Sequence, residues 1–328
     1  MEELSMKFKV LLTRVLQKEG LKELEKIADL ILPEEKKLFF TSEEILNYAP
    51  ILDGIIVSRA HIDAVFIDKA KKLKVISKFG VGYDTVDVEA VSRAGIILTN
   101  LPSTVTEVTA ELVFGIMLSL SRRIVEADRY LRKTQSNRWY QEALFMGHEL
   151  WDKKIGFIGF GRVGQATARR CLPFGMKIFY YDIEKKNNLR IKAQYIPFDQ
   201  LLEEMDYIVL QAPYSKSTHH LIGKNEIEKM KKSVYFINTA RGPEIDQKAL
   251  ISALKEKRIA GAALDVYENE PSIPQDLKLF DNVVLTSHLG TDTYETDLRM
   301  VKEASDNVIK VLTGAIPEFV VNRKELGL

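Results

Sequence analysis

A glycine-rich segment between two apolar runs places the strongest constraint on how this chain can fold. The segment reads GFGRVG over residues 159–164 and follows the apolar run 155–158. A helical pattern begins at Arg162, and a second apolar run over 177–181 ends in Asp182. Strand, glycine turn, helix, strand and acid, in this order, form the layout that binds a dinucleotide. The alternative is a glycine turn in an ordinary α/β unit, and the flanking strands and the acid favour the dinucleotide.

The three glycines of this segment are expected to have separate roles. Gly159 permits the tight turn, Gly161 lets the backbone approach a pyrophosphate, and Gly164 lets the helix pack closely on the strand. The start of the helix then presents free N–H groups and the positive end of its dipole to the phosphates. Residues 1–158 precede the segment, and we therefore expect another folded unit before the cofactor domain.

Composition bounds the class of protein. A length of 328 residues suggests about two domains, and the 46% of hydrophobic residues is enough for proper cores. The net charge of +1, from 47 basic and 46 acidic residues, argues against nucleic acid as a partner. The single cysteine, Cys171, excludes a disulfide framework and is expected to be a small buried residue. With no signal-peptide core and no apolar run of membrane-spanning length, we expect a cytoplasmic protein without a membrane partner.

Alternating strand and helix patterns predict an α/β fold with two doubly wound parallel sheets. The expected strands of the first sheet are 8–12, 29–32, 55–57, 75–77 and 96–98, and those of the second are 155–158, 177–181, 194–196, 207–210, 234–238, 262–266 and 283–286. This predicts a Rossmann cofactor domain inserted in a flavodoxin-like substrate domain, with a cleft between them. We expect residues 1–102 and 293–328 to form the substrate domain and residues 103–292 the dinucleotide-binding domain.

Two further segments carry local signals. Thr41 followed by Ser42, Glu43 and Glu44 predicts a capped helix start. Residues 106–133 have the longest helical pattern, and 135–150 are predicted to be a connecting loop. The apolar stripe of the long helix comprises Val108, Leu112, Ile116, Leu120 and Ile124. Such a helix is a core helix, or one that spans a domain junction or a dimer interface.

Three polar segments follow predicted strands, where ligands of such sheets bind. Arg241 in the segment 238–242 could hold a carboxylate through two hydrogen bonds, although a surface or capping role is equally compatible with its position. His288, between a strand and Gly290, is a candidate general acid. Glu270 precedes a proline and could orient another group.

The other acids and histidines give weaker signals. Glu268 is interpreted as part of a solvated loop. His219 and His220 are adjacent, so we expect them to point in different directions on the surface. No spacing of His, Asp and Glu predicts a metal site.

Taken together, these segments resemble the D-2-hydroxyacid dehydrogenases over essentially the whole chain. The matching pieces are FGVGYD at 79–84, TNLP at 99–102, Glu111, the glycine turn with Asp182, NTARG at 238–242, residues 265–271 and SHLG at 287–290. The glyoxylate, hydroxypyruvate and 2-ketogluconate reductases are the branch most similar in appearance. One departure is the segment 211–215, QAPYS, where the family often has a His-x-Pro-Leu-Thr loop.

The resemblance implies NAD(P)-dependent reduction of a small 2-keto acid to the D-2-hydroxy acid. Arg241 would bind the carboxylate and keto oxygen, His288 would donate the proton, and Glu270 would pair with His288 and favour its charged form. Backbone N–H groups of Val81 and Gly82 would hold the substrate carboxylate. The implied cofactor contacts are Gly159, Gly161, Arg162, Val163, Gly164, Asp182, Ala212, Pro213, Thr239, Ala240, Asp265 and Gly290, with Asp265 on the nicotinamide carboxamide.

Cofactor preference, assembly and two alternative functions follow from the same resemblance. Asp182 would accept from the adenosine ribose and repel a 2′-phosphate, which favours NAD(H), while Lys185 and Lys186 could offset that repulsion and admit NADP(H). A homodimer is expected through residues 106–133. The alternatives are a short-form D-3-phosphoglycerate dehydrogenase and an NAD(H)-sensing corepressor-like protein, the latter disfavoured because the chain ends at Leu328 without a tail. Formate dehydrogenases of this superfamily have Gln where Glu270 stands.

Overall fold

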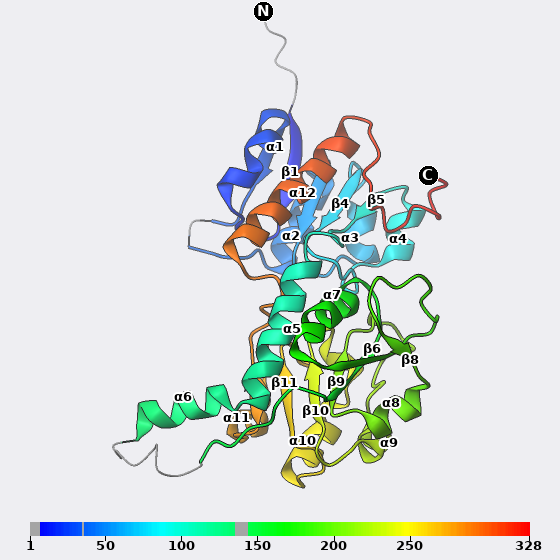
Figure 1. Ribbon diagram of the computed structural model, residues 1–328. Helices are drawn as coiled ribbons and strands as arrows, with labels where there is room; N and C mark the ends of the chain where they lie inside the picture. Colours follow the sequence, from blue (N-terminus) through cyan, green and yellow to red (C-terminus); the bar gives the residue numbers. More distant parts are fainter. Residues whose placement is uncertain (1–6, 35, 135–143) are drawn as a thin grey trace, which may run out of the picture. The chain divides into compact units, whose positions relative to one another are not determined.

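The computed structural model describes residues 7–34, 36–134 and 144–328. The chain divides into two compact units, which are shown in Figure 1. Unit 1 comprises Met1–Val105 and Thr291–Leu328, and unit 2 comprises Thr106–Gly290. Most of the predicted loop 135–150 lies outside the described residues.

Unit 1 is built on a five-stranded parallel sheet in the order β2-β1-β3-β4-β5. Its strands are β1 Phe8–Leu12, β2 Ala28–Ile31, β3 Gly54–Val57, β4 Val75–Lys78 and β5 Ile97–Thr99. Its α-helices are α1 Lys22–Ile27, α2 Ser42–Tyr48, α3 Ala64–Lys69, α4 Val88–Arg93 and α12 Tyr294–Leu312, with the 3₁₀ turns Lys18–Leu21 and Ala49–Ile51.

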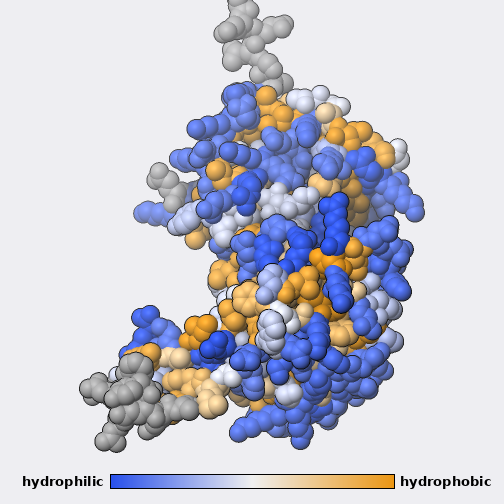
Figure 2. Space-filling model, in the orientation of Figure 1, coloured by the Kyte–Doolittle hydropathy of each residue, from blue (hydrophilic) through white to orange (hydrophobic). Residues whose placement is uncertain are grey.

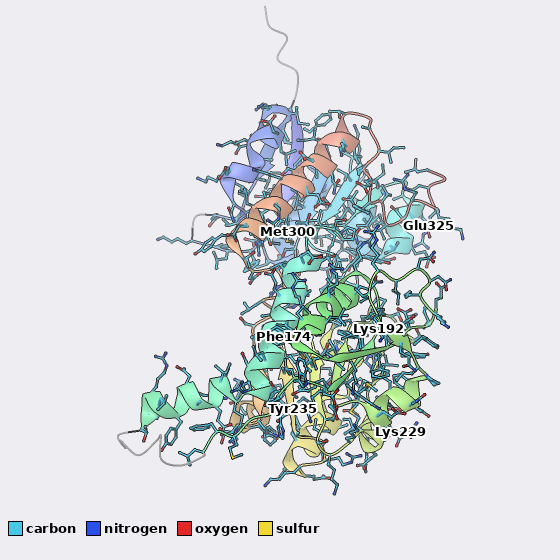
Figure 3. All side chains as sticks on the ribbon, viewed as in Figure 1. Phe174, Lys192, Lys229, Tyr235, Met300 and Glu325 are labelled. Carbon is cyan, nitrogen blue, oxygen red and sulfur yellow. The ribbon has the colours of Figure 1, made fainter. Side chains whose placement is uncertain are left out.

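Alternate residues of these strands enter two separate apolar clusters, because successive side chains of a strand point to opposite faces. Leu11, Ile55 and Ile76 belong to one cluster, and Val10 and Ile56 belong to the other. The second cluster is completed by α12, on which Met300 is buried (Figure 3).

The predicted cap at Thr41 is confirmed at the start of α2. The Thr41 side chain accepts a hydrogen bond from the N–H of Glu44, and the Glu44 carboxylate accepts from the N–H of Thr41. The reciprocal pair satisfies two backbone donors that the helix itself leaves open.

Unit 2 is built on a seven-stranded parallel sheet in the order β12-β11-β10-β9-β6-β7-β8. Its strands are β6 Lys154–Ile158, β7 Lys177–Tyr181, β8 Gln194–Tyr195, β9 Tyr207–Leu210, β10 Tyr235–Asn238, β11 Gly261–Leu264 and β12 Val283–Leu285. Its α-helices are α5 Thr106–Ser121, α6 Ile124–Lys133, α7 Arg162–Cys171, α8 Phe198–Glu204, α9 Lys224–Lys229, α10 Gln247–Lys255 and α11 Gln275–Leu279, with the 3₁₀ turns Leu172–Phe174 and Gly242–Glu244.

Helices cover both faces of this sheet. One face packs against α8, α9, α10 and α11, and the other against α5 and α7. On the second face Phe114 of α5 meets Phe174 with ring centroids 4.7 Å apart (Figure 3). Cys171 of α7 is buried there as expected, and burial raises the pKa of its thiol to about 12. The predicted α/β architecture with two doubly wound parallel sheets is confirmed.

The single helix predicted over 106–133 is wrong, because the chain breaks between α5 and α6. Arg123 adopts a left-handed conformation with a φ of 54°. The Ser121 carbonyl accepts from the N–H of His148 at 2.8 Å, and the Arg123 guanidinium binds Glu126 and the Leu144 carbonyl. Contacts with the segment after α6 therefore end α5, and the helical period of the sequence does not reveal them.

Because the strands of unit 2 are parallel, its loops lie at the two ends of the strands. We call the side where the strands end the carboxyl edge and the side where they begin the amino edge. The loops after β6, β9, β10, β11 and β12 share the carboxyl edge, and this edge receives the glycine turn and all three polar segments identified in the sequence. No helix among the described residues is long and apolar enough to cross a membrane.

Candidate active site

The glycine turn joins β6 to α7 and leaves space for a ligand at the helix start. Gly159 has a φ of 87°, and a Cβ there would lie 2.6 Å from the backbone nitrogen of Ala212. At Gly161 the position of a Cβ has no described atom within 4 Å. Gly161 is also the N-cap of α7, and it makes no side-chain capping bond to the first turn of the helix. The turn fits a pyrophosphate.

Asp182 closes this turn from the end of β7. Its carboxylate accepts from the N–H of Phe160 at 2.9 Å and from the Lys186 ammonium at 3.1 Å. Burial alone would raise the pKa of Asp182, but these bonds outweigh it and hold the pKa below its ordinary value. Asp182 is therefore a charged acceptor, and Lys186 lies beside it.

His288 and Glu270 form a pair at the carboxyl edge. The Nδ1 of His288 lies 2.9 Å from Oε2 of Glu270, and the other carboxylate oxygen accepts from the N–H of Tyr267 at 3.1 Å. The carboxylate only accepts, so Nδ1–H donates to it and Nε2 remains for chemistry. The His288 side chain is 35% exposed, which keeps it accessible.

Asp265 fixes the loop that carries His288. Its buried carboxylate accepts from the Thr286 hydroxyl at 2.6 Å, from the N–H of Leu289 at 2.7 Å and from the N–H of Gly290 at 3.1 Å. His288 itself adopts a left-handed φ of 60°, which is uncommon for a non-glycine residue. Three bonds to one carboxylate on both sides of His288 hold this conformation.

Arg241 follows β10 in a tightly tied loop. The Arg241 carbonyl accepts from the Asn238 amide at 2.9 Å, and the Arg241 N–H donates to the buried carboxylate of Glu244 at 3.0 Å. A Cβ on Gly242 would lie 1.9 Å from the carbonyl carbon of Tyr267, so only glycine fits there. The loop of Arg241 is therefore in direct contact with the loop of Glu270.

In unit 1, the segment 79–84 forms a loop after β4, and two of its backbone carbonyls accept hydrogen bonds from residues 100 and 101. The Gly80 carbonyl accepts from the N–H of Leu101 at 2.9 Å, and the Val81 carbonyl accepts from the Asn100 amide at 2.8 Å. Gly80 has a φ of 129°, in the region that favours glycine. Asn100, for which no role was predicted, thus holds the loop that contains Val81 and Gly82.

The sequence profile of the D-isomer specific 2-hydroxyacid dehydrogenase NAD binding domain matches residues 114–290. A glyoxylate reductase of Thermofilum pendens is 41% identical over 97% of this chain and 95% of its own length. The chain belongs to the D-isomer specific 2-hydroxyacid dehydrogenase family. The motif resemblance is confirmed, and with it an oxidoreductase that uses a nicotinamide dinucleotide.

Solved structures agree with this dehydrogenase assignment. The crystal structure of a glyoxylate reductase from Paecilomyes thermophila is 30% identical, has a TM-score of 0.87, and covers 97% of this chain and 99% of its own. An NADPH-dependent glyoxylate/hydroxypyruvate reductase from Sinorhizobium meliloti, in complex with NADP and malonate, is 28% identical with a TM-score of 0.84 and covers 96% and 97%.

Two interpretations of the dehydrogenase sequence are wrong. His219 and His220 do not point apart, since their rings stack with centroids 4.1 Å apart at 17°. Glu268 is not a free solvated acid, since its carboxylate lies 2.8 Å from Nε2 of His220 and its side chain is 23% exposed. The left-handed φ of 50° at His220 produces both results, because adjacent side chains of a regular element would diverge. A His and an acid 48 positions apart gave no local signal.

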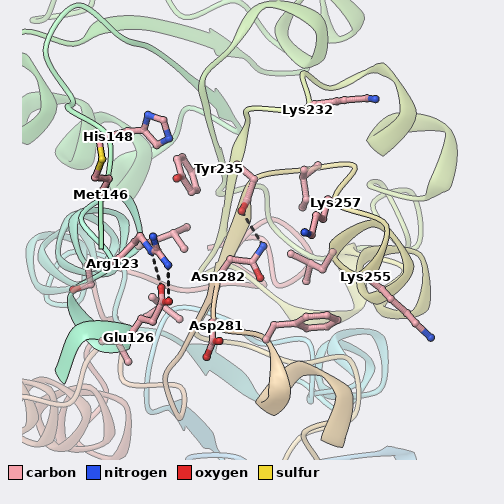
Figure 4. Close-up of a pocket in the computed structure, with 18 residues that line it drawn as sticks. Arg123, Glu126, Met146, His148, Lys232, Tyr235, Lys255, Lys257, Asp281 and Asn282 are labelled. Carbon is pink, nitrogen blue, oxygen red and sulfur yellow. Dashed lines mark hydrogen bonds and ion pairs between the residues drawn. The ribbon is translucent and has the colours of Figure 1, made fainter. Parts of the chain in front are cut away.

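A cavity of about 730 Å³ lies at the opposite, amino edge of the dehydrogenase's unit 2 sheet (Figure 4). It is lined by residues that start strands or precede them, such as Tyr235, Ala260 and Asn282, together with Arg123 and His148. None of the residues assigned to catalysis lines it. The size of this cavity therefore does not point to the site predicted from the sequence, whose residues follow strands at the carboxyl edge.

Proposed function

We propose that the protein reduces a small 2-keto acid of the glyoxylate or hydroxypyruvate type to the D-2-hydroxy acid with NAD(P)H. The observation that carries this proposal is the His288–Glu270 pair, in which the loop of Glu270 also packs against the loop of Arg241. The reductase relatives support the substrate class. The protein from Thermofilum pendens is named a glyoxylate reductase, and the similarity covers nearly the whole of both chains.

The residues of the site have the chemistry that such a reduction needs. A bound nicotinamide supplies the hydride. Hydride addition to the keto carbon creates an alkoxide, and His288 would give it the Nε2 proton while Glu270 compensates the charge on the ring. The Arg241 guanidinium would bind the carboxylate and stabilise the developing negative charge.

The remaining roles follow the division into units. The N–H groups of Val81 and Gly82 in unit 1 are proposed to hold the substrate carboxylate, which makes unit 1 the substrate domain. The glycine turn and the loops after β9 and β10, with Ala212 and Thr239, are proposed to hold the dinucleotide in unit 2. Asp265 is proposed to contact the nicotinamide carboxamide as well as the loop of His288.

We propose that NADH is preferred over NADPH. Asp182 stands at the end of β7, where its negative charge would repel a 2′-phosphate. Lys186 is bound to that carboxylate and would weaken the repulsion, so NADPH is expected to work less well rather than not at all.

A panel of 2-keto acids assayed with each cofactor tests the function. Glyoxylate, hydroxypyruvate, 2-ketogluconate and phosphohydroxypyruvate are compared by kcat/KM, and chiral analysis establishes the configuration of the product. We expect the first two to be the best substrates. Activity that is confined to phosphohydroxypyruvate would replace the proposal with a phosphoglycerate dehydrogenase. NADH binding without turnover of any keto acid would replace it with a cofactor sensor.

We also propose that the protein is a homodimer and that α6 contributes to the interface. None of the residues of α6 is buried, and Ile124 and Leu131 are 50% and 47% exposed. Apolar side chains gather on the surface where α6 extends from unit 2 (Figures 1 and 2). Sedimentation equilibrium is expected to give twice the chain mass, and a monomer at micromolar concentration would contradict the proposal.

A further inference from the structure

His220 connects two loops of the carboxyl edge that carry proposed catalytic residues. Its backbone N–H donates to the carbonyl of Pro243 at 2.9 Å, and its Nε2 lies 2.8 Å from Oε1 of Glu268. Pro243 belongs to the loop after β10, and Glu268 belongs to the loop after β11. One residue from the loop after β9 therefore holds the two neighbouring loops together.

The two attachment points are close in sequence to the proposed catalytic residues. Pro243 stands two positions after Arg241, and Glu268 stands two positions before Glu270. Glu268 and Glu270 thus lie in the same loop but pair with different histidines, Glu268 with His220 and Glu270 with His288. A shift of either loop would change the distance between Arg241 and His288.

Packing between the two loops leaves little room for adjustment. Gly242 fits against the backbone of Tyr267 only because it has no Cβ. The loops therefore touch through backbone at Gly242 and are joined by hydrogen bonds at His220. The contact at Gly242 prevents the loops from approaching, and His220 opposes their separation.

The backbone of His220 shows that this connection is held against a conformational cost. A φ of 50° is uncommon for a residue with a side chain, and such conformations persist where the surroundings hold them. Here the ring is stacked on His219, whose Nδ1 lies 3.2 Å from the hydroxyl of Tyr214. The loop after β9 thus supports the His220 ring through His219 and Tyr214.

We propose that His220 is a positioning residue that, through Glu268 and Pro243, sets the spacing between Arg241 and the His288–Glu270 pair. The inference rests on the proposed function, since it assigns His220 to the geometry of that reaction. Misplacement of a reacting group by about 1 Å can cost about 10²-fold in rate. A positioning residue such as His220 can therefore control turnover without touching the substrate.

The first test is the His220→Ala variant, assayed by steady-state kinetics with the best keto acid of the panel. We expect kcat/KM to fall by about tenfold, mostly through kcat, because the loss concerns transition-state geometry. The Kd for NADH, measured by fluorescence, should stay within about twofold of wild type, since the glycine turn is unchanged. The matched control is His148→Ala, the same change at the amino edge, which should leave kcat/KM unaltered.

Rescue separates positioning from a general loss of stability. His220→Gln keeps an amide donor within reach of Glu268 and should recover most of the activity, whereas His220→Ala does not. The double variant His220→Ala/Glu268→Ala should be no slower than His220→Ala alone, because both changes remove the same contact. A purely structural role would lower Tm in all these variants without this pattern in kcat.

The outcomes distinguish this proposal from the proposed function. Wild-type protein without keto acid reduction would refute the function itself. An active wild type with a His220→Ala variant within about twofold of its kcat/KM would overturn the positioning role alone. Additive losses in the double variant would also overturn it, because His220 and Glu268 would then act independently.

Discussion

Hydrogen-bonded carboxylates lie at both the amino edge and the carboxyl edge of the unit 2 sheet, but they have different roles at the two edges. At the amino edge, Asp206 accepts from the N–H of Lys154 and from the Lys231 ammonium, both at 2.9 Å, while its carbonyl accepts from the N–H of Tyr235 at 3.0 Å. These bonds join the starts of β6, β9 and β10. At the carboxyl edge, Glu268 and Glu270 bind histidines that lie in loops.

The two kinds of pair differ in whether the partner of the carboxylate retains a group that can transfer a proton. Lys231 donates to Asp206 through its one ammonium group, so this pair only holds strands together. Among the described residues His288 is bound through Nδ1, so its second ring nitrogen can exchange a proton. The comparison predicts that changes at the carboxyl edge reduce turnover and spare stability, while changes at the amino edge have the opposite effect.

The largest expected effect is that of His288→Ala. Removing the proton donor should lower kcat by about 10²–10⁴-fold, the usual worth of general acid catalysis. Steady-state assays measure the loss, and NADH titration should show that cofactor binding survives. Near-normal turnover would show that His288 is not the donor.

Arg241→Lys should have the next largest effect. A lysine cannot reproduce the planar two-pronged contact of a guanidinium, so we expect KM for the keto acid to rise and kcat to fall, with kcat/KM reduced about 10²-fold. Initial rates over a range of keto acid concentrations separate the two terms. An unchanged KM would argue against the contact with the substrate carboxylate.

Asp182→Ala should change the choice of cofactor more than the rate. Removing a charge–charge repulsion of about 1 kcal/mol should shift the NADPH to NADH ratio of kcat/KM about fivefold toward NADPH. The comparison is made at one fixed ionic strength, because salt screens the phosphate. If the ratio does not move, Lys185 and Lys186 become the next candidates for the selector.

The smallest effect on turnover is expected for Asp206→Asn, which tests the amino edge. Burial would raise the pKa of Asp206, but the bonds from Lys154 and Lys231 outweigh it and lower the pKa below its ordinary value. A lowered folded pKa contributes stability above the unfolded pKa of about 3.9, and this is lost as pH falls through the folded pKa.

Near neutral pH the free energy of unfolding of the variant should therefore be about 1 kcal/mol lower than that of wild type. The difference between the two proteins should disappear in acid. Urea unfolding at several pH values measures the difference, and kcat is measured on the folded variant. A drop in kcat without a loss of stability would contradict the division between the two edges.

Local patterns in the sequence determined the alternation of strands and helices and led to the proposed catalytic residues. The apolar runs and glycines around residues 159–164 predict the cofactor turn, because strand, turn and helix are adjacent in the chain. Arg241, Glu270 and His288 each follow a predicted strand, and parallel strands bring their carboxyl ends to one edge. These inferences need only short-range periodicity and one rule of topology.

Only the tertiary structure decided features that depend on contacts between distant segments or on one unusual dihedral angle. The break after α5 depends on His148 and Leu144 binding atoms of residues 121 and 123, which periodicity within the helix does not register. The His220–Glu268 pair requires both a left-handed backbone and the proximity of two loops. A sequence pattern records neither condition, because each is enforced by packing against residues far away in the chain.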